Sequence, residues 1–309
     1  MRTSAVMFEQ PGRLALAELP LDAPGPGDLV IEVAHSGISS GTEKLLWQGR
    51  MPAFPGMGYP LVPGYEAVGS VAEAGSGAAF AIGEPVFVPG ARCFGEVRAL
   101  FGGAARTLVV PEARVVRNPV GDARGVLLAL AATAHHALAG GAAPELIVGH
   151  GAVGRLLARI AIARGDPPPV VWERAPERRA GRFGYEVTTA EEDPRRDYRV
   201  AYDCSGDETI IDALLPRMAK GGEIVLAGFY AAPIRFAFPP AFMREARLRV
   251  AAEWRPDDMA AVLELIERGR LALDGLVTDQ RPARDAEAAY ARAFGAADCL
   301  KMVLDWGEA

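Results

Sequence analysis

The chain shows two different patterns of hydrophobic and polar residues. Between Ser4 and about Asn118, apolar and polar positions alternate in short runs, such as 29–33 and 67–72, which are separated by turns rich in proline and glycine. A period of two is typical of strands with one buried face. We therefore predict a β-rich, partly barrel-like region in the first third of the chain.

From about Pro119 to Arg255 the pattern changes, because helical segments now alternate with short apolar runs. The apolar runs are 146–148, 170–171, 200–203, 223–227 and 248–250. This alternation predicts a parallel, doubly wound α/β sheet. Beyond Pro256 we expect an amphipathic helix over 257–269, a short strand near 276–277, a second helix over 283–293 and a closing strand over 301–304.

The first apolar run of the α/β region leads into a glycine-rich turn. Residues 145–154 read Glu-Leu-Ile-Val-Gly-His-Gly-Ala-Val-Gly, and a helical pattern follows. Gly149 permits a tight turn, Gly151 lets the backbone approach a pyrophosphate, and Gly154 lets the helix pack on the strand. The pattern therefore predicts a dinucleotide site at a helix N-terminus, although the glycines could also merely shape a tight turn.

The next strand ends in Glu173, about twenty residues beyond the last glycine. A carboxylate there can bind both ribose hydroxyls of NAD, and it repels a 2′-phosphate. We therefore predict NAD as the cofactor. Arg174, Arg178 and Arg179 follow directly, and arginines at such positions can instead accommodate NADP.

Charge and cysteine content narrow the class of protein. A formal net charge of -6 disfavours nucleic acid as a partner. Three widely separated cysteines, Cys93, Cys204 and Cys299, fit neither a disulfide framework nor a metal knuckle. The most apolar window, 126–134, is too short to span a bilayer, and Glu9 interrupts any secretory signal. We expect a cytoplasmic protein with no integral membrane segment.

Two short motifs carry a family resemblance. Gly64-Tyr-Glu66 and Ser40-Gly-Thr-Glu43 stand where the medium-chain dehydrogenase/reductase family usually has Gly-His-Glu and Cys-Gly-Thr-Asp, and the chain resembles that family. The resemblance implies an N-terminal GroES-like catalytic domain, a Rossmann NAD-binding domain, and a C-terminal segment that returns to the catalytic domain. The implied boundaries are 1–118 with 257–309 for the catalytic domain and 119–256 for the Rossmann domain. It also implies a homodimer.

The resemblance narrows to family members that act on chlorophyll-type pigments, over residues 36–47, 50–66, 87–97, 222–230 and 298–306. It implies NAD-dependent oxidation of the 3-(1-hydroxyethyl) group of chlorophyllide or bacteriochlorophyllide a to 3-acetyl, with this tetrapyrrole as the partner. One alternative is a zinc-independent quinone or enone reductase of the same family, which commonly prefers NADPH. Another is a pigment carrier without catalysis.

The residues that hold the catalytic zinc in related enzymes are not present at the matching positions of this sequence. Residue by residue, the first falls on Ser39 or Ser40, the second on Tyr65 and the third near Ala129, and none is a ligand that zinc prefers. We therefore predict no metal, so a protein hydroxyl or a water relay must take the alcohol proton. Tyr65 is the first candidate, Thr42 matches the family's hydroxyl relay, and Ser40 is the third. Tyr65 could instead simply fill the vacated space, with Glu66 pairing an arginine.

Further binding residues follow from adaptable apolar side chains and from the resemblance. We expect the pigment to contact the segment that follows residue 46, and two opposing phenylalanines, although the segment could equally be a lid that packs on its own lobe. These residues are Trp47, Met51, Phe54, Met57, Tyr59, Phe94 and Phe101. The resemblance implies further nucleotide contacts at Thr133, Val153, Arg174, Cys204, Ser205 and Gly228. For His135 and His136, packing is favoured over catalysis.

Overall fold

The computed structural model describes residues 1–53, 56–181 and 184–307. The chain divides into two compact units, Met1–Ala129 with Asp274–Ala309, and Leu130–Leu273. The predicted fold class, a β-rich GroES-like domain with a Rossmann domain and a returning C-terminal segment, is confirmed. The expected boundaries were after residues 118 and 256, whereas the first unit extends to Ala129 and the helix after Pro256 groups with the second unit.

The first unit contains two sheets, because its strands switch between two layers of alternating apolar residues. One sheet has the order β2-β1-β4-β7. These strands are β1 (Arg2–Gln10), β2 (Arg13–Pro20), β4 (Leu61–Pro63) and β7 (Arg98–Leu100). The other has the order β16-β17-β3-β5-β6-β9, with β8 also paired to β3. Its strands are β3 (Asp28–Ile38), β5 (Ala67–Ala74), β6 (Pro85–Val88), β8 (Thr107–Pro111), β9 (Val116–Arg117), β16 (Asp279–Pro282) and β17 (Met302–Asp305).

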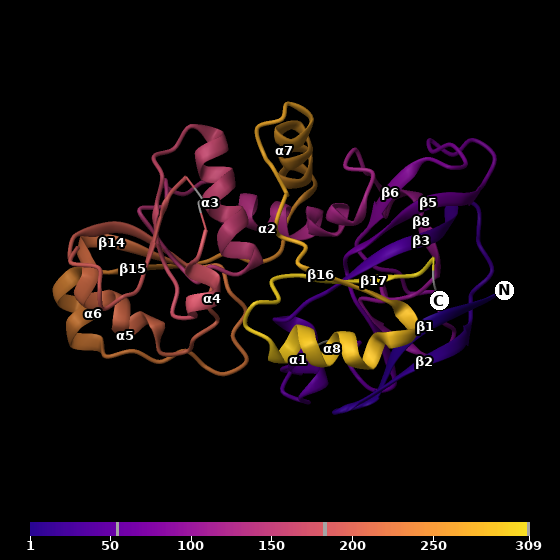
Figure 1. The fold of residues 1–309 in the computed structure, drawn as a ribbon, viewed down its shortest axis with the longest axis horizontal. Helices are drawn as coiled ribbons and strands as arrows, with labels where there is room; N and C mark the ends of the chain where they lie inside the picture. Colours follow the sequence, from indigo (N-terminus) through magenta and orange to yellow (C-terminus); the bar gives the residue numbers. More distant parts are fainter. Residues whose placement is uncertain (54–55, 182–183, 308–309) are drawn as a thin grey trace. The chain divides into compact units, whose positions relative to one another are not determined.

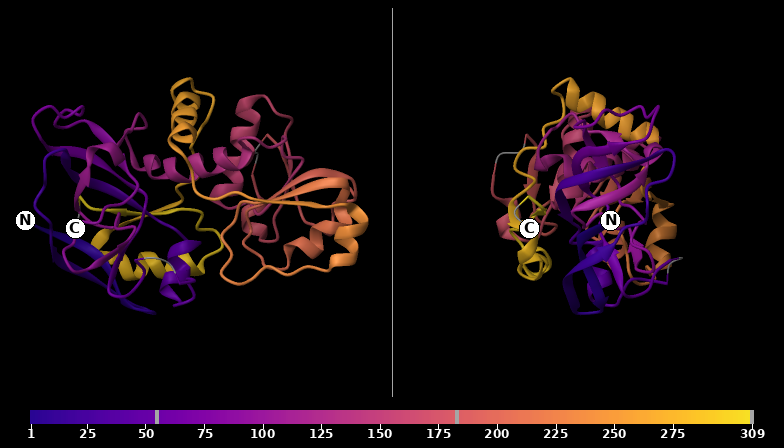
Figure 2. Two further views of the ribbon diagram at one scale, coloured as in Figure 1. Left: turned by 180° about the vertical axis from the view of Figure 1, so that it is seen from behind. Right: turned by 90° about the vertical axis from the view of Figure 1, so that its right-hand side faces the viewer.

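The C-terminal segment completes this unit. Strand β17 pairs antiparallel with β3, so that Leu304 lies opposite Ser36. Helix α8 (Ala286–Gly295) lies beside α1 (Thr42–Trp47), as Figures 1 and 2 show from opposite sides. The strand expected near 276–277 is instead β16, whose sequence Asp-Gln-Arg-Pro has no apolar run and pairs with β17 through its backbone.

The second unit is a parallel sheet with the order β12-β11-β10-β13-β14-β15. Its strands are β10 (Leu146–Val148), β11 (Val170–Trp172), β12 (Glu186–Thr188), β13 (Tyr198–Asp203), β14 (Met218–Leu226) and β15 (Arg247–Val250). Its helices are α2 (Leu128–Leu138), α3 (Ala152–Arg164), α4 (Pro176–Arg179), α5 (Ile210–Leu214), α6 (Phe238–Arg244) and α7 (Pro256–Glu267). Helices α3 and α5 lie on opposite sides of the sheet (Figure 1). The five predicted strands are present, and β12 is an additional one.

Helix α7 belongs to the second unit because buried polar contacts tie it to α2. Asp258 accepts hydrogen bonds from the Nδ1 atoms of His135 and His136, each at 2.8 Å. Both histidines thus have a polar partner on α7, which agrees with the structural role favoured for them. Within the described ranges, no helix combines the length and the apolar character needed to cross a bilayer.

Candidate functional site

The glycine-rich turn has the geometry predicted for Gly149 and Gly154. Gly149 follows β10 with a φ of 94°, and Gly151 is the N-cap of α3. A Cβ atom on Gly154 would lie 1.9 Å from the carbonyl oxygen of Gly149, so that only glycine allows the helix to pack this closely on the turn. Val153 lies in the first turn of α3. The N–H groups of the first turn of a helix are suited to bind an anion, and the glycine-rich turn brings this helix end next to β10.

The turn lies at the point where the strand order reverses. Strand β10 has β11 on one side and β13 on the other, and ligands of open α/β sheets bind at the carboxyl ends of strands at such a point. A Cβ on Gly149 would lie 3.2 Å from the carbonyl carbon of Cys204, and a Cβ on Gly228 would lie 3.0 Å from the nitrogen of Gly206. The turns after β10, β13 and β14 therefore form one continuous rim, which includes Ser205.

Glu173 directly follows β11 and is buried beside the glycine-rich turn. One carboxylate oxygen accepts the backbone N–H of His150 at 2.9 Å, and the other accepts that of Ala175 at 2.8 Å. A carboxylate has about four lone-pair sites, so two remain for ribose hydroxyls. The side chain of Arg174 is 93% exposed and has Asp207 as its nearest acidic partner, at 4.0 Å. Thr133 lies on α2 and is half-buried.

A buried histidine beneath the same turn was missed by the sequence analysis. His150 is 0% exposed, and its Nδ1–H donates to the carbonyl of Arg178 at 2.7 Å, so Nε2 accepts from the hydroxyl of Tyr185 at 2.9 Å. Burial, reinforced by the charge of Arg155, lowers the pKa of His150 to about 4. The ring is therefore neutral and links the turn to the chain after β11. A polar residue between two glycines of the motif is the only sequence signal.

Three hydroxyl groups meet in the first unit, from the loops that follow β3 and β4 and from the first residue of α1. The Tyr65 hydroxyl donates to Ser39 Oγ at 2.8 Å, and the Thr42 hydroxyl lies 3.0 Å from Ser39 Oγ and 3.3 Å from the Tyr65 oxygen. We call Ser39, Thr42 and Tyr65 the hydroxyl cluster. Two predicted residues, Tyr65 and Thr42, are thus brought together. Ser40 is exposed and outside the cluster, and its neighbour Ser39 occupies the central position.

The surroundings of Tyr65 keep its hydroxyl neutral. Burial raises the pKa of Tyr65 above its ordinary value, and the nearby charge of Glu66 raises it further. A tyrosinate is therefore disfavoured, so Tyr65 acts as a neutral hydroxyl that donates and accepts hydrogen bonds. Phe101 packs edge-on against the Tyr65 ring, with 5.8 Å between the ring centroids.

Two buried carboxylates lie behind the hydroxyl cluster. Glu66 pairs with Lys301 at 2.7 and 2.9 Å, and Lys301 also donates to the carbonyl of Ile38. An arginine was expected from the sequence as the partner of Glu66, and this is corrected, because the partner is Lys301. Glu43 accepts the backbone N–H of Ser39 at 2.9 Å and the hydroxyl of Tyr290 at 2.8 Å.

The residues at the family's zinc positions do not fit zinc. Ser39 and Tyr65 offer neutral hydroxyls, and Ala129 offers no ligand atom. The neighbouring carboxylates are already engaged, Glu66 by Lys301 and Glu43 by Ser39 and Tyr290. Among the described residues, no three His, Cys, Asp or Glu side chains are grouped to hold a metal ion.

The predicted pigment-binding side chains differ in where they lie. Phe101 lies next to Tyr65, as described above. Trp47, Met51, Met57 and Tyr59 are half-buried and pack against the hydrophobic core of the first unit. Phe94 is a correction: it is only 1% exposed and belongs to that core, so it cannot form a pocket wall. The sequence pattern around Phe94 gives no sign that other parts of the first unit cover this side chain. Phe54 lies outside the described residues.

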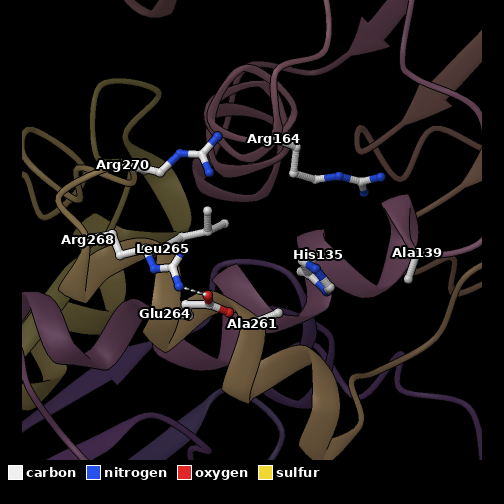
Figure 3. Close-up of a pocket in the computed structure, with 8 residues that line it drawn as sticks. All are labelled: His135, Ala139, Arg164, Ala261, Glu264, Leu265, Arg268 and Arg270. Carbon is white, nitrogen blue, oxygen red and sulfur yellow. Dashed lines mark ion pairs between the residues drawn. The ribbon is translucent and has the colours of Figure 1, made fainter.

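A basic pocket of about 370 Å³ lies elsewhere in the second unit (Figure 3). It is lined by His135, Ala139, Arg164, Ala261, Glu264, Leu265, Arg268 and Arg270. Its basic groups serve helix ends: Arg164 is in the last turn of α3, Arg270 donates to Ala163 in that turn, and Arg268 pairs with Glu264 of α7. Cations at helix C-termini are stabilising in themselves. The pocket contains none of the predicted site residues.

Comparisons with known proteins agree with this geometry. The sequence model of the alcohol dehydrogenase GroES-like domain matches residues 25–120. The chain is 59% identical to the 2-desacetyl-2-hydroxyethyl bacteriochlorophyllide A dehydrogenase of Cereibacter sphaeroides, over 99% of both chains. It is 56% identical to the protein of that name from Rhodobacter capsulatus, over 100% of both. A short chain alcohol dehydrogenase of Escherichia coli CFT073, solved with NADH, shares the fold with a TM-score of 0.84 at 19% identity, over 99% of both chains.

Proposed function

This chain belongs to the medium-chain dehydrogenase/reductase family, and from that premise we propose the reaction that it catalyses. It is an oxidoreductase that acts on a CH–OH group. We propose that it oxidises the 3-(1-hydroxyethyl) group of chlorophyllide or bacteriochlorophyllide a to 3-acetyl in bacteriochlorophyll biosynthesis, with NAD as the hydride acceptor. The observation that carries this proposal is the 59% full-length identity to a relative named for that type of substrate.

The hydroxyl cluster is our candidate for handling the alcohol proton. Ser39 Oγ accepts from Tyr65 and contacts Thr42, so a proton can pass along the three oxygens. A relay of hydroxyls needs no lasting charge on Tyr65, which suits a phenol whose pKa is raised by burial. NAD, when bound, supplies the acceptor for the hydride that leaves the carbinol carbon. The proton then leaves through Thr42 or Tyr65 toward water.

We propose that the reaction needs no catalytic zinc. The carbinol carbon of a 1-hydroxyethyl group can spread its developing positive charge into the conjugated macrocycle, which lowers the electrostatic help that the protein must supply. Metal analysis of active protein should find no stoichiometric zinc, and strong chelators should leave turnover intact. Magnesium carried by bound pigment must be counted separately. Activity that chelators abolish and zinc restores would refute this part of the proposal.

NAD rather than NADP is proposed from the environment of Glu173. Its buried carboxylate faces the glycine-rich turn and would repel a 2′-phosphate at the ribose. Arg174, Arg178 and Arg179 follow it, and they are the groups through which NADP could still bind. Glu173 retains two lone-pair sites for the ribose hydroxyls, which supports NAD.

The pigment is proposed to lie against Phe101 and the segment that contains Met51, Met57 and Tyr59. Phe101 contacts Tyr65, so a planar apolar ligand stacked on Phe101 would have its side chain near the hydroxyl cluster. Replacing Phe101 by Ala should raise the KM for pigment and leave the KM for NAD unchanged. If Phe101→Ala changed the KM for pigment and the KM for NAD equally, the pigment would not bind against Phe101.

We also propose a homodimer formed through the edge of the second unit. Strand β15 pairs with β14 on one side, and Leu248 and Val250 are exposed on it. Helix α6 exposes Phe238, Phe242 and Met243. Exposed apolar side chains beside an edge strand favour association with another chain. Analytical ultracentrifugation should give twice the chain mass, and Val250→Lys should yield monomers.

A cytoplasmic location is proposed from the cysteines. Cys93, Cys204 and Cys299 are all free thiols, as expected in a reducing compartment. Fractionation of cells that express a tagged chain would test the location.

One assay tests the central proposal. Purified protein, NAD and the 3-(1-hydroxyethyl) pigment should give a red-shifted absorption, because the new carbonyl is conjugated with the macrocycle. No shift with either redox state of the cofactor would favour a carrier. Turnover of an enone with NADPH, but none of the pigment, would favour the reductase alternative.

A further inference from the structure

Glu43 is a buried carboxylate to which the proposed proton path assigns no role. It is 1% exposed, and each of its two oxygens accepts one hydrogen bond. Oε1 accepts the backbone N–H of Ser39, four residues earlier, and Oε2 accepts the hydroxyl of Tyr290, which lies 247 residues later. The carboxylate therefore ties the loop that carries Ser39 to the C-terminal helix α8.

Tyr290 is itself fixed in place. It is 1% exposed, and its ring packs edge-on against Phe8 and Phe294, with centroid distances of 5.3 and 5.5 Å. A ring held on two sides presents its hydroxyl in one position, so the hydrogen bond to Glu43 has little freedom. Other ionisable groups near Glu43 are Glu66, Lys301 and Tyr65.

The backbone N–H of Ser39 is held from the side of helix α1 by Glu43. Helix α1 begins after Gly41, whose position has no side-chain cap hydrogen bond. The bond from Glu43 to Ser39 N–H closes the turn before α1 from the helix side and holds the backbone of Ser39. Ser39 Oγ is the atom that accepts from Tyr65 at 2.8 Å. A shift of this backbone would therefore separate the hydroxyls.

We propose that Glu43 and Tyr290 are positioning residues that fix Ser39 for the hydroxyl cluster, so that the C-terminal segment sets the geometry of the proton path. This inference rests on the proposed function of the cluster. Neither residue touches the reacting atoms, so both act through Ser39.

Tyr290→Phe is the sharpest test, because it keeps the packed ring and removes only the hydroxyl. We expect kcat to fall about tenfold, with the KM values for NAD and pigment unchanged, since misplacement of a reacting group by about 1 Å can cost about 10²-fold. The matched control is Tyr198→Phe in the second unit, which removes a similar buried bond, at 2.7 Å to Asp193. The control should lower thermal stability comparably and leave kcat unchanged.

Glu43 is tested with two variants. Glu43→Gln can still accept from Ser39 N–H through its oxygen and can donate to Tyr290, so it should keep most of kcat. Glu43→Ala loses both bonds and should lose about 10²-fold in kcat. If Glu43→Gln falls as far as Glu43→Ala, the charge is required and positioning is the wrong explanation.

One set of variants distinguishes the positioning role of Glu43 and Tyr290 from the proposed proton path. If Tyr65→Phe lowers kcat while Tyr290→Phe and Glu43→Ala keep it, the positioning inference is overturned and the proposed proton path stands. If Tyr65→Phe and Ser39→Ala both keep full kcat, the proposed path itself is wrong. If Tyr290→Phe and Tyr198→Phe lower kcat equally, the effect is one of stability and the inference also fails.

Discussion

The nucleotide site and the hydroxyl cluster are built in opposite ways. The nucleotide turn consists mainly of backbone groups of residues 149–154, with Glu173 from the next strand. The hydroxyl cluster consists of side chains, and buried residues as distant as Tyr290 and Lys301 support it. A site made of backbone needs small residues at fixed spacing, whereas a site made of side chains needs a correctly assembled interior. The geometry of the hydroxyl cluster should therefore depend more strongly than that of the nucleotide turn on buried residues that are distant in the sequence.

Breaking the ion pair behind the hydroxyl cluster should have the largest effect. Lys301→Met leaves the carboxylate of Glu66 buried without its partner, and such changes cost about 3–5 kcal/mol of unfolding free energy. Urea unfolding of the variant and the wild type measures this loss. The double variant Lys301→Met with Glu66→Gln should recover most of it, because no unpaired charge remains. A loss below about 1 kcal/mol would mean that the cluster does not depend on this support.

The stability contribution of Glu43 should depend on pH. Burial raises its pKa from 4.5 to about 7, so the native state favours the protonated form. The favourable contribution is fully present below about pH 4.5 and is lost as the pH rises through about 7. Relative to Glu43→Gln, the wild type should lose up to about 3 kcal/mol across this range. Unfolding free energies of both proteins measured from pH 4.5 to 8 test this, and parallel curves would contradict it.

Removing the Tyr65 hydroxyl should lower kcat and so test whether the hydroxyl cluster takes part in catalysis. Tyr65→Phe keeps the ring against Phe101 and should lower kcat about 10²-fold or more, the usual scale for a positioned acid–base group. Steady-state kinetics with pigment and NAD measure it, and thermal stability should change little. Thr42→Val should cost less if water can replace its hydroxyl. Near-full activity of Tyr65→Phe with inactive Thr42→Val would reverse the two roles.

The nucleotide site should show the smallest effect, confined to cofactor choice. Glu173→Ala removes the group that bonds the ribose and repels a 2′-phosphate, so NAD binding should weaken by about tenfold while NADP binding changes less. Titration of each cofactor measures the two dissociation constants. Glu173→Gln is the matched control, because it keeps the size and removes the charge. Equal weakening of NAD and NADP would show that Glu173 does not contact the ribose.

The amino-acid sequence alone determined the architecture and the position of the glycine-rich turn. Apolar runs at 146–148, 170–171 and 200–203 coincide with strands of the parallel sheet, and Gly149 and Gly154 have the predicted turn geometry. These features could be predicted because strand period and glycine conformation are local properties of the chain. Even so, β16 escaped detection, since its pairing with β17 depends on backbone groups and not on apolar side chains.

The tertiary structure alone decided which side chains form the hydroxyl cluster. Ser39 and Ser40 are adjacent and chemically alike, and only the course of the chain at the end of β3 directs Ser39 toward Tyr65. The pairing of Glu66 with Lys301 joins residues 235 positions apart. Likewise, Phe94 resembles a pocket residue in the sequence but is enclosed in the core. Burial and long-range pairing depend on how distant segments pack together, and no local pattern of residues carries that information.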